Sequence, residues 1–83
     1  MWVTNGESAV NVDRVNRLFL RQLKGSAELI AKFDSGDEAV IASGALEEMF
    51  DLLEAIVYEH EYSERTVFDI ESWRRKRDLE VQQ

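Results

Sequence analysis

The sequence predicts an α+β fold: an antiparallel four- to five-stranded β-meander packed against one amphipathic helix, followed by a second C-terminal helix. Up to about residue 43, apolar and polar residues alternate between glycine turns; from residue 44 onward, apolar residues recur every three or four positions. The first pattern is typical of an antiparallel sheet and the second of a helix. Because a one-sided helix must bury its apolar stripe, we expect it on the apolar face of the meander.

Turn signals divide the first 43 residues into short strands. Asn5-Gly6 is a strong hairpin signal that follows Trp2 and Val3, and residues 9–12 can return as the second strand. Asp13 and Arg14 interrupt this strand. The remaining predicted strands and turns are strand 15–23, turn 24–26, strand 29–33, turn 34–37 and strand 39–42.

The first helix is predicted over residues 44–61. Ser43 or Gly44 can cap it, and Glu47 and Glu48 lie in its first turn, where the helix dipole favours acids. Its apolar stripe consists of Leu46, Met49, Phe50, Leu53, Val57 and His60, widened by Ala45, Leu52 and Ile56.

The second helix is predicted over residues 66–81. Thr66 and Asp69 resemble a capping box with Asp in place of Glu. A continuous helix over residues 45–81 is the alternative, because a heptad frame survives the junction. We favour a break near Tyr62.

Length and composition predict a single cytoplasmic domain spanning residues 1–83. Hydrophobic residues make up 45% of the chain and charged residues 33%, which is an ordinary globular balance. There is no cysteine, so disulfides, thiolate zinc sites and cysteine nucleophiles are excluded. No apolar run is long enough to span a membrane, and residues 1–6 lack the pattern of a secretory signal.

Charge segregation is the most informative feature for function. Between Phe33 and Glu64 there are ten acids and no lysine or arginine, in a chain of net charge −7. One face of the first helix carries four carboxylates with no cation on the same helix, and we predict that they bind a basic surface of a host protein: Glu47, Glu48, Asp51 and Glu54. The alternative is a solvated acidic face.

Basic residues suggest a second kind of site. Arginines could line a pocket between subunits and hold a small phosphorylated nucleotide, and the candidates are Arg14, Arg17, Arg21, Arg74, Arg75 and Arg77. The run from Arg74 to Arg77 could instead dock on the acidic helix of another chain, or lie in solvent with Arg77 against Trp73. The negative net charge argues against direct nucleic-acid binding.

A homo-oligomer, in the simplest case a homodimer, is expected from apolar residues near the chain ends. Trp2 and Trp73 have few intramolecular positions to fill, and the C-terminal helix has a heptad-like pattern. The predicted oligomer interface comprises Trp2, Val67, Ile70 and Trp73.

Catalysis is not expected. The single histidine, His60, falls at the end of the apolar stripe, and no phosphate loop, metalloprotease or nucleophile-elbow motif occurs. Residues 34–38 lack the length and terminal glutamate of a calcium loop. We therefore predict no enzyme activity, no catalytic residue, no metal and no cofactor.

The order of elements over residues 1–54 resembles small phage and prophage proteins, and also small proteins of flagellar operons. The resemblance is carried by Trp2-Val3, the bend at residues 10–13, the Asp34-Ser35-Gly36 turn and the Glu-rich helix from Ala45 to Leu53. The phage resemblance implies a non-enzymatic protein that blocks a host factor, as an anti-defence inhibitor does. The alternatives are the nucleotide sponge and a structural or adaptor oligomer.

Overall fold

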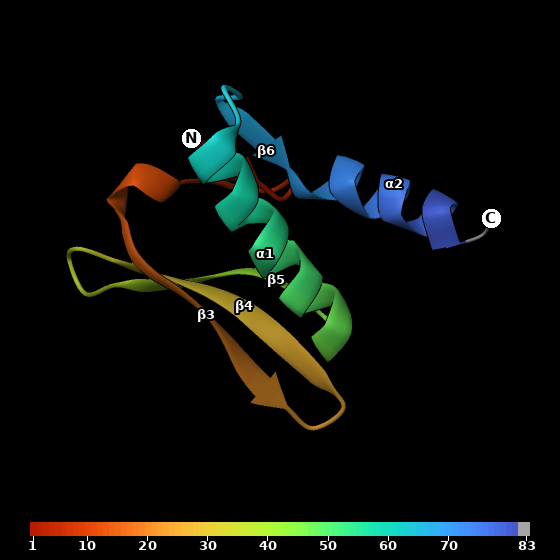
Figure 1. The fold of residues 1–83 in the computed structure, drawn as a ribbon. Helices are drawn as coiled ribbons and strands as arrows, with labels where there is room; N and C mark the ends of the chain where they lie inside the picture. The colour runs from red at the N-terminus through yellow and green to blue at the C-terminus, as the bar shows by residue number, and fades with distance from the viewer. Residues whose placement is uncertain (82–83) are drawn as a thin grey trace.

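A computed structural model describes residues 1–81 and shows an α+β fold with two three-stranded sheets and two α-helices (Figure 1). In chain order, the elements are β1 (Trp2–Thr4), β2 (Ala9–Asn11), the 3₁₀ turn η1 (Val12–Arg14), β3 (Val15–Leu23), β4 (Ser26–Phe33), β5 (Glu38–Gly44), α1 (Leu46–Tyr62), β6 (Val67–Asp69) and α2 (Ile70–Val81).

The antiparallel meander has three strands, in the order β3-β4-β5, where the sequence predicted four or five. Its two hairpins turn at the predicted places. Gly25 and Gly36 adopt φ values of 80° and 94°, a left-handed conformation that glycine reaches without strain.

The first two strands belong to a separate sheet with the order β2-β1-β6. Asn11 caps η1: its side chain accepts a hydrogen bond of 3.0 Å from the backbone N–H of Asp13. The strand therefore ends here, as predicted from Asp13 and Arg14. This bend redirects the chain before β3, so β2 cannot continue into the meander. Strand β1 instead pairs antiparallel with β2 and parallel with β6.

The two helices are separate, which confirms the break near Tyr62. Helix α1 ends there, and residues predicted to open the second helix form β6 instead. Helix α2 begins at Ile70, where Asp69 Oδ1 accepts hydrogen bonds from the backbone N–H groups of Glu71 and Ser72. Within residues 1–81, neither helix is long and apolar enough to cross a bilayer.

One hydrophobic core joins both sheets. Helix α1 lies across one face of the meander (Figure 1) and buries Met49, Leu52 and Ile56 completely. Strand β4 supplies Leu29 and Ala31 beneath the helix. Residues from the second sheet and from the start of α2 enter the same core: Val3, Phe68 and Ile70.

A hydrogen bond to a β-bulge in β5 links the β1–β2 loop to the meander. Along β5, Val40 and Ala42 pair with consecutive residues of β4, so Ile41 is the extra residue. The Asn5 side-chain amide donates a hydrogen bond of 3.0 Å to the backbone carbonyl of Ile41. The β1–β2 loop is thereby fixed against β5.

Candidate protein-binding surface

The apolar stripe of α1 is only partly covered by the sheet beneath it. The buried residues are Met49, Leu52 and Ile56, whereas Leu46, Phe50 and Val57 remain 42%, 51% and 47% exposed. Large apolar side chains aligned along one helix face are typical of interaction surfaces.

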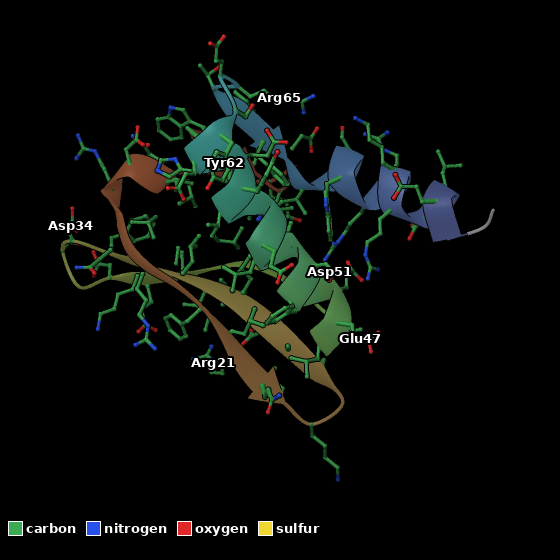
Figure 2. The ribbon with its side chains drawn as sticks, in the orientation of Figure 1. Arg21, Asp34, Glu47, Asp51, Tyr62 and Arg65 are labelled. Atoms are coloured by element: carbon green, nitrogen blue, oxygen red, sulfur yellow. The ribbon has the colours of Figure 1, made fainter. Side chains whose placement is uncertain are left out.

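Leu46 and Phe50 border a hollow between α1 and the edge strand β3, which we call the α1–β3 groove. Its lining residues are Leu20, Gln22, Leu46, Glu47, Phe50 and Asp51, and its volume is about 710 Å³. Two of the four predicted partner-binding acids, Glu47 and Asp51, line it beside the apolar side chains of Leu20, Leu46 and Phe50, and we call these two acids its rim. Figure 2 shows both acids on α1. The apolar hollow beside these acids was not predicted from the sequence, and their role in partner binding stays a prediction.

Two of the acids on α1 form ion pairs within the chain. Arg74 Nε lies 2.7 Å from Glu48 Oε1, and Arg77 Nη2 lies 2.7 Å from Asp51 Oδ2. Helix α1 itself contains no lysine or arginine, and α2 provides these two cations. The basic run thus docks on the acidic helix of its own chain.

Further contacts hold the basic run in this position. Arg74 Nη2 donates a hydrogen bond of 2.7 Å to the carbonyl of Ser43, and the guanidinium of Arg77 lies 5.8 Å from the centre of the Trp73 ring. The predicted pair of Trp73 and Arg77 is confirmed. The hydrogen bond with Asp51 raises the pKa of Arg77 above its ordinary value, so this residue stays charged at every pH at which the protein is handled.

Glu47 and Glu54 differ from the other two acids. Both are exposed, and among residues 1–81 no lysine or arginine forms an ion pair with either of them. They are therefore the acids on this face that remain open to a cationic partner.

The candidate nucleotide-binding arginines do not converge within one chain. Arg17 lies 4.9 Å from the centre of the Phe19 ring and Arg21 pairs with Glu28, both on the sheet face opposite α1. Arg74 and Arg77 contact α1 instead, and Arg75 donates to the Ser72 hydroxyl. Arg14 is exposed at the end of η1.

The residues predicted for an oligomer interface divide into two groups. Trp2 and Val67 are cross-strand partners on β1 and β6, and both are about half exposed. Ile70, in contrast, lies in the core of its own chain at 1% exposure, and Trp73 packs against that core. Burial within the chain removes Ile70 from any exposed surface.

His60 lies in a surface hollow with Val12, Leu18 and Val57, and its Nδ1 is 3.9 Å from Asp13 Oδ1. Within residues 1–81, no three His, Asp or Glu side chains gather as a metal site would require. Among the described residues, the acid–base groups near the imidazole are Asp13 and Glu61, and the other residues that line the hollow are apolar.

Comparison of the chain with protein-family models, curated proteins and solved structures finds no match. The resemblance to small phage proteins therefore stays a prediction.

The groove was not predicted, because the whole apolar stripe was expected to lie in the core. The width of the stripe is the signal in the sequence that indicates an uncovered part. Apolar residues occupy positions 45, 46, 49, 50, 52, 53, 56 and 57, a wider arc than the roughly 100° typical of a helix that covers one sheet. The excess lies on the side of Leu46, Phe50 and Val57, where the edge strand β3 leaves it uncovered.

Proposed function

We propose that this protein is a non-enzymatic binding protein that occupies a basic and partly apolar surface of another protein and so blocks it. One observation carries the proposal: the α1–β3 groove exposes Leu46 and Phe50 beside the carboxylates Glu47 and Asp51. An apolar floor with an acidic rim fits a partner segment that combines apolar and basic side chains.

The two parts of the groove have different tasks in this proposal. Apolar side chains of the partner bury against Leu46 and Phe50, where exclusion of water provides most of the affinity. Glu47 at the rim and Glu54, two turns further along α1, attract the partner's basic side chains, and such peripheral charges mainly raise the association rate and favour the right partner. The blocked partner is proposed to be a host factor, as the phage resemblance implies.

A protein partner is preferred to a phosphorylated nucleotide. A nucleotide phosphate needs several arginines around one concave site. In this chain, Arg21, Arg74 and Arg77 already form ion pairs with carboxylates of the same molecule. Arg21 lies on the face of the meander opposite α1, whereas Arg74 and Arg77 lie on α2 and contact α1.

The acids must be tested selectively, because Glu48 and Asp51 also hold α2. A partner is first isolated from host lysate on immobilised protein and identified, and its dissociation constant is then measured by calorimetry. We expect Phe50→Ala to weaken binding at least about tenfold, as loss of a central aromatic contact does. The double variant Glu47→Lys, Glu54→Lys should lower the association rate and its salt dependence.

Matched controls separate the groove from general surface effects. Val67→Ala removes an equally exposed apolar side chain on β6, and Glu7→Lys with Glu64→Lys makes the same charge change outside α1. Both controls should bind like the unmodified chain. Binding that is insensitive to Phe50→Ala and to the two charge reversals on α1 would refute the proposal.

A further inference from the structure

The face of the meander opposite α1 carries three rows of side chains that cross all three strands, and we call it the open face. Because side chains alternate along a strand, Ile30 points away from the core that holds Leu29 and Ala31. The strand register defines the rows: Phe19-Ile30-Val40, then Arg17-Lys32-Glu38 on one side and Arg21-Glu28-Ser43 on the other. Figure 2 shows Arg21 on the side of the sheet away from α1.

The central row of the open face is apolar. Ile30 is only 1% exposed although, within residues 1–81, no helix or second sheet packs on this face. Its neighbours cover it: Phe19 is half-buried beneath Arg17, while Val40 on the other side is 47% exposed. The face therefore presents a narrow apolar strip between charged rows.

Charge changes sign across the open face. The edge strand β3 contributes Arg17 and Arg21, whereas β5 contributes Glu38 at the opposite edge of the row that begins with Arg17. A surface that is basic at one edge and acidic at the other can complement itself through a two-fold axis.

We propose that a second copy of this chain packs on the open face, to form a two-fold sandwich of two meanders. The axis runs parallel to β4 and passes between Ile30 and its counterpart. It places β3 of each copy over β5 of the other, so that Phe19 meets Val40 and Arg17 meets Glu38, twice each. Sheets packed face to face lie about 10 Å apart, within reach of these side chains.

Contacts between charged side chains favour this arrangement over two other ways of pairing the chains. A two-fold axis perpendicular to the strands would place Arg17 against Arg21 of the second copy. Pairing of two β3 edges would bring together the acidic rims of two α1–β3 grooves. In the proposed arrangement two like-charge contacts remain at the axis, one between Lys32 and its counterpart and one between Glu28 and its counterpart. Each is offset within its own chain, because Glu38 lies beside Lys32 in register and Arg21 forms an ion pair with Glu28.

The size of the face sets the strength of the dimer. Strands of nine, eight and seven residues form it. At the usual rise and spacing of strands they span an area of roughly 400 Å², which is less than the roughly 800 Å² per partner of a standard interface. We therefore expect a reversible dimer that dissociates on dilution. The α1–β3 groove lies on the other side of the sheet and stays accessible, so the dimer does not depend on the proposed function.

Sedimentation equilibrium of the full chain over a wide concentration range tests the proposal. Arg17→Glu and Glu38→Arg should each raise the dimer dissociation constant at least about tenfold, because each places like charges in contact. An equimolar mixture of these two variants should form a heterodimer, since both contacts are then between opposite charges. Lys32→Gln should tighten the homodimer.

Controls make the charge argument specific. Lys24→Glu and Glu7→Arg make the same changes in charge at exposed loop positions and should leave dimerisation unchanged. A chain that is monomeric at all concentrations would overturn the proposal, and so would a dimer that survives both single reversals or variants that do not associate when mixed. Loss of the dimer in Val67→Glu but not in Arg17→Glu would place the interface on the sheet β2-β1-β6 instead.

Discussion

The two helices of this protein are held to the fold by different forces. Helix α1 buries Met49, Leu52 and Ile56 completely in the core. Helix α2 contributes Ile70 and the inner side of Trp73, then projects from the body (Figure 1), where two partly exposed ion pairs with α1 hold it. Burial of apolar surface is little affected by salt, whereas exposed ion pairs are weak and screened. Helix α1 is thus a permanent part of the fold, and the attachment of α2 depends on conditions.

The largest difference in stability between the two helices is expected from a cavity beneath α1. Leu52→Ala should lower the free energy of unfolding by about 2–5 kcal/mol, because it removes buried methyl groups and leaves a cavity. Urea denaturation followed by circular dichroism measures the change. As a control, Leu79→Ala on the exposed side of α2 should change it by less than about 0.5 kcal/mol. Equal effects of the two substitutions would mean that both helices contribute equally to the free energy of unfolding, which would contradict this comparison of the two helices.

A smaller effect is expected at the start of α2. Asp69→Ala removes the acceptor of two backbone N–H groups and should destabilise α2 by about 1 kcal/mol. Asp69→Asn keeps an acceptor oxygen and should retain most of that stability. Amide hydrogen exchange reports both, with the loss confined to α2. Faster exchange in α1 as well would contradict the independence of the two helices.

The smallest global effect is expected from the ion pairs. Arg74→Gln with Arg77→Gln should accelerate amide exchange in α2 and leave α1 unchanged, and high salt should do the same to the unmodified chain. The raised pKa of Arg77 means that its stabilising contribution is complete below its ordinary pKa and is lost only as the pH rises through the folded value. Salt, rather than pH near neutrality, is therefore the variable to change.

The control for this pair of substitutions lies on the same helix. Arg75→Gln with Lys76→Gln removes the same charge, but neither residue forms an ion pair with α1 within residues 1–81. Exchange in α2 should then stay slow. If both double variants behave alike, the net charge of α2 and not its contact with α1 governs its stability.

Local signals in the sequence account for much of the fold. Gly25 and Gly36 predicted two hairpins because only a few residues adopt a left-handed backbone without strain, and the period of 3.6 located α1. The site was predicted less well. Glu47 and Asp51 were identified by their charge, but Leu46 and Phe50 carry the same pattern as core residues, and only the position of β3 shows that they are uncovered.

The features that the sequence did not predict depend on distant pairing. Strand β6 has three residues, too few for a period to be visible, and its ladder partner is β1 at the other end of the described chain. The ion pairs of α2 likewise join residues more than twenty positions apart, Arg77 with Asp51 and Arg74 with Glu48. No local pattern distinguishes such a cation from one that lies in solvent.

The parallel pairing of β1 with β6 has a consequence for the order of folding. It joins the second residue of the chain to the sixty-seventh, whereas the meander and α1 are built from neighbouring segments. Closing a long loop costs more conformational entropy than closing a hairpin, so contacts between neighbours form first. On the ribosome, the meander can assemble with α1 while β1 still has a vacant edge, and that edge stays open to wrong pairing until residues 67–69 have emerged.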